Sequence, residues 1–166
     1  MATPTYTALA TITLSSSASS VTFSNISQLF RDLVLVVNWQ NSGTASASRL
    51  QINGDTGSNY SSVWMVGQGS TTGSSSESGQ TSARLFGASL GPSNTYSNVG
   101  IVQFLDYSAT DKHKTVLDRY SSANTDVQAS AIRWASTSAI TSFRVFDVLG
   151  QTYSAGSTFS LYGIAA

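Results

Sequence analysis

Few side chains in this chain could do acid–base, nucleophilic or metal chemistry. Its 166 residues include one histidine (His113), one glutamate (Glu77), two lysines (Lys112 and Lys114), seven aspartates and no cysteine. The polar residues are instead mostly hydroxyls, since 32 serines and 19 threonines make 51 of the 166 residues. So few titratable groups favour a structural or recognition protein over an enzyme.

The spacing of these groups indicates neither a hydrolase nor a metal site. A Ser–His–Asp hydrolase needs an oriented nucleophile and an oxyanion hole, and no Gly-x-Ser-x-Gly elbow follows an expected strand here, because the chain lacks the strand–elbow–helix context. Zinc sites need three or four His or Cys ligands, and His113 is the only one of either kind. We therefore expect no catalytic residue, no metal site and no cofactor.

The aspartates also resemble structural carboxylates more than catalytic ones. A glycosidase needs two carboxyl groups that face each other across a cleft, one of them with a raised pKa. Asp118 and Arg119 are adjacent in the sequence, and so are Arg31 and Asp32. We expect both pairs to form ion pairs at the surface or at an interface.

The sharpest local signal is Asn53-Gly-Asp-Thr-Gly-Ser-Asn59, with oxygen-bearing side chains at positions 53, 55 and 59. A helix–loop–helix calcium site needs glycine at its sixth position and a carboxylate at its twelfth, where this chain has Ser58 and Trp64. Asn-Gly and Thr-Gly supply the positive φ angles of a tight β-turn. We predict a turn in which Asp55 and Asn59 bond to nearby backbone, with a weak cation or ligand loop as the alternative.

Aromatic side chains could stack on sugars or bury against a protein partner. Trp64 and Trp134 fall within expected strands, where packing in the core is the default. Trp39 ends the most apolar strand, and we expect it to show one face at the rim. Together with the neighbouring turn it gives a candidate set of interface or glycan contacts. The set is Trp39, Asn53, Asp55, Asn59 and Tyr60.

The abundant hydroxyl residues also indicate the fold class. Serine and threonine are weak in helices because their hydroxyls compete for backbone hydrogen bonds, and threonine suits a half-buried strand. Short β-type segments recur between Ser-, Gly- and Asn-rich breaks, which predicts an all-β antiparallel sandwich or barrel. The expected strands are 5–14, 20–23, 32–39, 48–53, 60–66, 83–86, 98–107, 115–120, 127–134, 142–148 and 158–164.

Two of these strands have distinctive patterns. Five consecutive apolar residues, Leu33–Val37, predict a central strand that is covered on both faces. Near the C-terminus the chain alternates, so that Phe159 and Leu161 should face one way and Ser160 and Tyr162 the other.

We expect a single domain over residues 1–166, with one low-complexity interruption. Residues 67–80 (GQGSTTGSSSESGQ) contain no apolar side chain. This composition predicts a long flexible Gly/Ser-rich loop at one end of the sandwich, or an arm that orders only against a neighbour.

The charge pattern limits the partners. A formal net charge of zero gives no electrostatic reason to expect nucleic acid or an anionic membrane as a partner. The first residues lack the basic and apolar regions of a signal peptide, and no apolar run is long enough for a membrane span. We expect a protein made in a cytoplasm and not inserted in a membrane.

Several segments, taken in order, resemble a known family. Tyr6-Thr-Ala-Leu-Ala10 opens the first expected strand and is followed by Ser20-Val-Thr-Phe-Ser-Asn-Ile26 and Asp32-Leu-Val-Leu-Val36. Leu50–Ser61 comes next, and Ala155-Gly-Ser-Thr-Phe-Ser-Leu-Tyr-Gly-Ile164 closes the chain. Over nearly its whole length the chain resembles small virion proteins of tailed bacteriophages, described as decoration, cement or tail-fibre components. The resemblance implies a jelly-roll-like sandwich that forms a homotrimer on the particle surface, and it carries over no enzymatic residue.

The expected function is therefore structural. The first hypothesis is a capsid decoration or cement protein that binds the major capsid protein, or other virion proteins, as an oligomer and stabilises the head. The alternative is a tail-fibre or receptor-binding module that recognises host cell-surface glycan. In either case the expected location is the virion.

Overall fold

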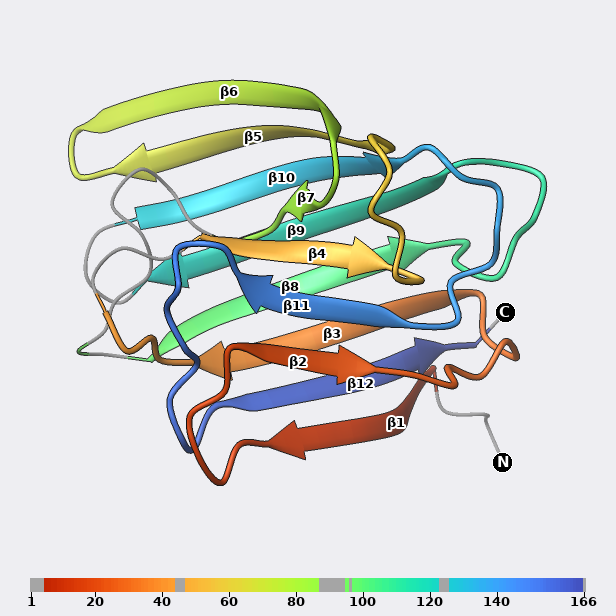
Figure 1. The fold of residues 1–166 in the computed structure, drawn as a ribbon, viewed down its shortest axis with the longest axis horizontal. Helices are drawn as coiled ribbons and strands as arrows, with labels where there is room; N and C mark the ends of the chain where they lie inside the picture. Colours follow the sequence, from red (N-terminus) through yellow and green to blue (C-terminus); the bar gives the residue numbers. More distant parts are fainter. Residues whose placement is uncertain (1–4, 44–46, 87–94, 96, 123–125, 166) are drawn as a thin grey trace.

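The computed structural model describes residues 5–43, 47–86, 95, 97–122 and 126–165. These ranges contain twelve strands, all paired antiparallel, in two sheets that face each other as a sandwich (Figure 1). No helix in this part of the chain has the length and apolar character needed to cross a membrane. The strands are β1 (Tyr6–Thr13), β2 (Ser20–Phe23), β3 (Asp32–Trp39), β4 (Ser48–Ile52), β5 (Tyr60–Gln68), β6 (Thr71–Gln80), β7 (Ala83–Arg84), β8 (Asn98–Leu105), β9 (Lys114–Ser122), β10 (Asp126–Trp134), β11 (Phe143–Asp147) and β12 (Thr158–Ile164).

Eight of these strands have the order of a jelly roll. One sheet contains β1-β12-β3-β8 and the other is β2-β11-β4-β7. The first strand thus pairs with the last, the second pairs with β11 in the opposite sheet, and the chain alternates between sheets at both ends. This nested pairing is the double Greek key of a jelly roll. The prediction of an all-β, jelly-roll-like sandwich is confirmed.

Two hairpins are inserted into this frame, and both extend the same sheet. The hairpin β5–β6 follows β4, and the hairpin β9–β10 follows β8. They add four strands beside β8, in the order β8-β9-β10-β5-β6, so the larger sheet has eight strands and the smaller one four. In Figure 1, β5 and β6 lie beyond the edge of the smaller sheet.

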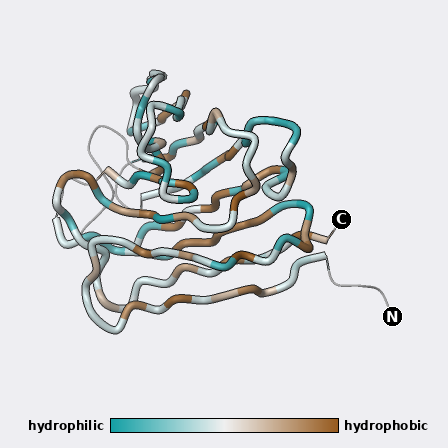
Figure 2. Tube along the Cα trace, turned by 45° about the vertical axis from the view of Figure 1, so that its right-hand side comes forward, coloured by the Kyte–Doolittle hydropathy of each residue, from teal (hydrophilic) through white to brown (hydrophobic). Residues whose placement is uncertain are grey.

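The core lies between the sheets and is filled by alternate residues of each strand. Phe159 and Leu161 of β12 are buried, while the residues between them are half-buried, as the alternation predicted. In β3, Val34 is buried on the opposite side from the core and Val36 is half-buried there, so this strand is largely covered on both faces. Figure 2 shows that hydrophobic stretches lie mainly in the strands and hydrophilic ones mainly in the connections.

Residues 67–80 do not form the loop predicted from their composition. They contain the end of β5, a two-residue turn at Gly69 and Ser70, and all of β6, which is the edge strand of the larger sheet. Gly69 has a φ of 56°, a left-handed conformation of the kind that tight hairpin turns use.

Backbone pairing and one carboxylate hold β6 in place. The strand is paired with β5 along its length, and most of its side chains are exposed hydroxyls. Glu77 instead accepts hydrogen bonds from the Arg49 guanidinium of β4 and from the backbone amide of Arg84 in β7. The loop was the wrong prediction because it assumed that a strand needs apolar side chains to bury. An edge strand needs only one ladder of backbone hydrogen bonds and an anchor to the sheet behind it.

Candidate interaction surface

Residues 53–59 form the tight turn predicted from the sequence. Asn53 and Gly54 have φ angles of 51° and 69°, and the Asp55 amide donates to the Ile52 carbonyl at 2.9 Å. Two successive positive φ angles are the mark of a type I′ turn, for which Asn-Gly is the preferred pair.

Asp55 joins this turn to β10. Its carboxylate accepts hydrogen bonds from the Gly57 amide (2.8 Å), the Asn59 side-chain amide (2.8 Å) and the Trp134 indole (2.7 Å). Burial alone would raise the pKa of Asp55, but these three donors outweigh it and lower the pKa below its ordinary value. Because the fold supplies every donor, the carboxylate acts as a structural acceptor.

Two further residues of the candidate set are also bonded within the protein. The Asn53 side-chain oxygen accepts from the amides of Thr141 (2.9 Å) and Ser142 (3.0 Å). The Tyr60 side chain is buried, and its hydroxyl accepts a hydrogen bond from the Ile52 amide at the end of β4, at 2.9 Å. Burial raises the pKa of Tyr60 to about 12. The turn therefore brings Asn53, Asp55 and Tyr60 together, but their polar atoms bind the protein itself.

Trp39 does not lie at the rim, so that prediction is wrong. The side chain is 1 % exposed and stacks on Phe86 with ring centroids 4.5 Å apart. Trp134 is buried as predicted, and Trp64 lies under the guanidinium of Arg84, 4.6 Å from the ring centroid. All three tryptophans of the chain are thus engaged inside the fold.

The titratable groups are scattered. His113 lies exposed in the connection between β8 and β9, beside the Arg133 guanidinium. Within the described ranges, no three His, Cys, Asp or Glu side chains come together in a way that could hold a metal ion. Arg31 and Asp32 form the expected ion pair at 2.9 Å.

Asp118 and Arg119 do not form the ion pair expected of them. They are successive residues of β9, so their side chains point to opposite faces of the sheet. Asp118 points inward and is 1 % exposed, whereas Arg119 is exposed on the other side.

The inward side of β9 and β10 carries a buried polar layer. Burial raises the pKa of Asp118 to about 8, opposed only in part by Ser130, Arg84 and Gln128. Gln128, also buried, donates to the Leu85 carbonyl (2.9 Å) and to the Ser130 hydroxyl (2.8 Å). Asp118, Gln128 and Ser130 thus form one polar layer on the inward side of the sheet.

The opposite side of the same strands is unusual because it exposes large apolar side chains. We call the side of β8, β9, β10, β5 and β6 that is turned away from the smaller sheet the outer face. Six of the ten large hydrophobic side chains that are exposed among the described residues lie on it. Contiguous exposed apolar surface of this kind marks a binding site more often than chance. The six are Val63, Met65, Val99, Ile101, Leu105 and Val127.

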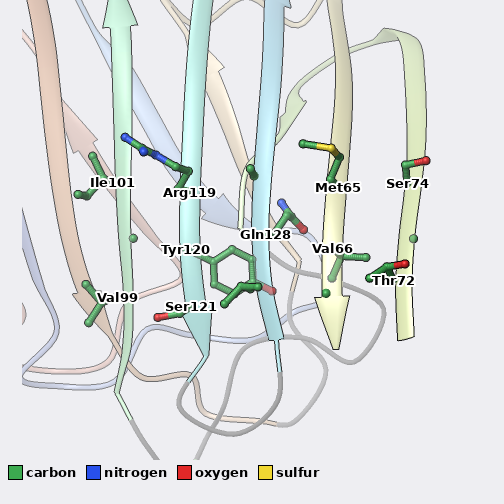
Figure 3. A pocket seen from close by; sticks show the side chains of 15 residues that line it. Met65, Val66, Thr72, Ser74, Val99, Ile101, Arg119, Tyr120, Ser121 and Gln128 are labelled. Carbon is green, nitrogen blue, oxygen red and sulfur yellow. The ribbon is translucent and has the colours of Figure 1, made fainter. Parts of the chain in front are cut away.

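Backbone register places these side chains in rows across the strands. One row runs Ile101–Arg119–Ala129–Met65–Ser74, and the next runs Val99–Ser121–Val127–Gly67–Thr72. Figure 3 shows Ile101, Arg119, Met65 and Ser74 on neighbouring strands. The rows line a shallow hollow of about 900 Å³ whose lining is mainly apolar.

Only arginines bring charge to the outer face. Arg119 and Arg133 lie on it, and the other outward positions of these strands are apolar, hydroxyl, glycine or glutamine residues. Tyrosine and tryptophan are missing from its outward positions, so a sugar ring would find no aromatic platform there. The surface is suited to another protein surface.

The sequence contained a signal for this face. Residues 98–105 (NVGIVQFL) are apolar at odd and even positions alike, and residues 63–66 are apolar without interruption. Such runs indicate strands that are covered on both sides. In the described part of the structure, nothing covers the outer side of these strands.

No protein-family model matches the chain, and no curated protein sequence matches it.

Proposed function

We propose that this protein is a structural component of a bacteriophage virion, a decoration or cement protein that binds the head surface as an oligomer. The observation that carries the proposal is the exposed, mainly apolar outer face, which is suited to contact between protein subunits. Burial of such a face releases about 25 cal/mol per Å² of apolar surface, and this is how an adhesive protein without catalytic groups would act.

Two further features support the proposal. The jelly-roll order is one that capsid proteins use repeatedly. The sequence segments that resemble phage virion proteins form β1, β2, β3, the β4–β5 connection and β12, which are parts of the jelly-roll frame.

In this function several weak contacts would act together. Copies held in an oligomer bind neighbouring shell subunits simultaneously, and the resulting avidity can exceed each single affinity by about 10²–10⁴. A neutral, hydroxyl-rich surface repels its neighbours weakly and tolerates such packing.

Binding to capsids tests the proposal. Purified protein is mixed with expanded capsids of the bacteriophage that encodes it, and co-sedimentation and the temperature of capsid disruption are measured. We expect saturable binding and a higher disruption temperature. If the protein does not bind, and capsids that lack it resist heat equally well, the proposal is wrong.

Recognition of a host glycan gains no specific support. The side chains expected to make glycan contacts are buried, as in Trp39 and Tyr60, or bonded to other groups of the protein, as in Asn53, Asp55 and Asn59. Binding on a glycan array, together with inhibition of adsorption to host cells, would favour that function over cementing.

A further inference from the structure

We propose that the outer face binds the outer face of a second copy of this chain, about a two-fold axis that runs parallel to the strands between β10 and β5. The inference specifies the oligomer of the proposed function: a second copy would cover the outer face, and the shell would contact other surfaces of the dimer. It is also testable on the purified chain alone.

The first argument is the alternation of large and small side chains between β10 and β5. Three successive outward pairs are Val127 with Gly67, Ala129 with Met65, and Ala131 with Val63. Each pair combines a large residue with a small one. A two-fold axis between the two strands places β10 of one copy over β5 of the other, so each large side chain faces a small residue.

This arrangement is self-complementary, as an isologous interface requires. Met65 of each copy would enter the space above Ala129 of the other, and Val63 would enter the space above Ala131. Sheets that pack face to face interdigitate in this way at about 10 Å separation. Met65 and Val127 are 63 % and 59 % exposed in the single chain, so both would gain most of their burial from the second copy.

The same axis also keeps the Arg119 side chains of the two copies apart. β9 of one copy lies over β6 of the other, so Arg119 faces Ser74, an exposed hydroxyl residue of a strand whose one acid, Glu77, bonds elsewhere. The two Arg119 backbones are then three strand spacings apart across the interface, roughly 17 Å, which exceeds the screening length of about 10 Å at 0.1 M salt. The two Arg133 backbones, at the end of β10, are one strand spacing apart in projection, roughly 11 Å across the interface; each guanidinium is directed toward His113 of its own chain.

The area is sufficient for a specific dimer. Four strands at about 4.8 Å spacing and nine residues at about 3.4 Å cover roughly 600 Å² per copy. The total of roughly 1,200 Å² is at the lower limit of standard interfaces. In this arrangement β8 lies beyond β6 of the second copy, so its Val99 and Ile101 are not counted. A three-fold ring would instead need two different surfaces that fit each other, whereas this face fits itself.

The decisive measurement is the oligomeric state of the purified chain, followed by light scattering and sedimentation from about 1 to about 100 µM. We expect a dimer. Met65→Glu puts a charge opposite Ala129 of the second copy and should weaken the dimer by about 100-fold or more. The matched control is Thr13→Glu, an exposed position of β1 in the same sheet but outside the proposed contact, which should leave the dimer intact. Far-ultraviolet circular dichroism should show both variants folded.

Exchanging the large residue at position 65 with the small residue at position 129 tests the proposed contact between the two copies. Ala129→Met alone should crowd Met65 of the second copy and weaken the dimer by about tenfold. Met65→Ala combined with Ala129→Met restores one large and one small residue at each contact, and should recover most of the affinity. A monomer or trimer at about 100 µM, an unchanged dimer in Met65→Glu, or no recovery in the double variant would each overturn the proposal. A failure here leaves the capsid-binding experiment unaffected, and the reverse also holds.

Discussion

The two halves of the larger sheet differ in what their inward sides bury. In the jelly-roll half, the inward side chains of β3 and β8, such as Leu35 and Phe104, are fully buried hydrophobic groups. In the inserted half, the middle of β9 and β10 turns Asp118, Gln128 and Ser130 inward, behind Arg119 and Ala129 of the outer face. The inserted hairpins thus bury a polar layer where the frame buries apolar side chains, and together with β8 they form the outer face.

The largest effect should come from the inward side of β8. Phe104→Ala removes a fully buried ring that stacks on Phe143 at 4.7 Å, and should lower the free energy of unfolding by about 3–5 kcal/mol. Urea denaturation measures the loss. Ile101→Ala, three residues earlier on the outward side, is the control and should cost less than about 1 kcal/mol in the monomer. Equal losses would contradict the contrast between the two sides.

The buried polar layer should make the inserted half sensitive to pH. The raised pKa of Asp118 means that the folded state holds a proton which the unfolded state releases above about pH 4. This group's contribution to stability therefore falls as pH rises from about 4 to about 8. Asp118→Asn should remove the decline and stabilise the protein at pH 8 by about 2 kcal/mol.

Urea denaturation of wild type and Asp118→Asn at pH 5 and pH 8 measures this effect. The difference between the two proteins should be small at pH 5 and should favour the variant at pH 8. A constant difference at both pH values would mean that Asp118 is ionised throughout.

A smaller effect is expected where β6 is anchored to the smaller sheet. Glu77→Gln removes the charge that binds Arg49, and should cost about 1–2 kcal/mol. Hydrogen exchange should become faster in β6 and stay unchanged in β12, at the far side of the same sheet. Uniform acceleration in both strands would show that β6 unfolds only together with the whole domain.

The smallest effect should be on the outer face itself. Val63→Thr changes an exposed side chain and should alter the free energy of unfolding of the monomer by no more than about 0.5 kcal/mol. Thermal unfolding of dilute protein measures it. A large loss would mean that the outer face stabilises the single chain, and the contrast between the two halves would then disappear.

Much of the fold could be predicted from local patterns. All eleven expected strands overlap strands of the structure, and the turn at Asn53 and Gly54 has the predicted backbone. These features depend on residues that are close in sequence, through side-chain alternation and positive φ angles. The missing strand was β6, because its serines carry no alternation of apolar and polar residues and its order depends on pairing with β5 and on Glu77.

The candidate site was predicted less well, and for a related reason. Trp39 was placed at the rim because polar residues follow it, but Phe86, far away in the sequence, packs against its ring. Asp118 and Arg119 were paired because they are neighbours in sequence, yet strand geometry directs neighbours to opposite faces.

By itself the sequence determined the fold class, the strand periods and the scarcity of catalytic groups, because composition and spacing fix local backbone preferences. Only the tertiary structure decided which side of β5, β9 and β10 meets the smaller sheet. A period of two shows which residues share a side, but the direction of that side depends on where the hairpins join the sheet. That choice left Met65 and its neighbours exposed on the outer face and buried Asp118 behind them.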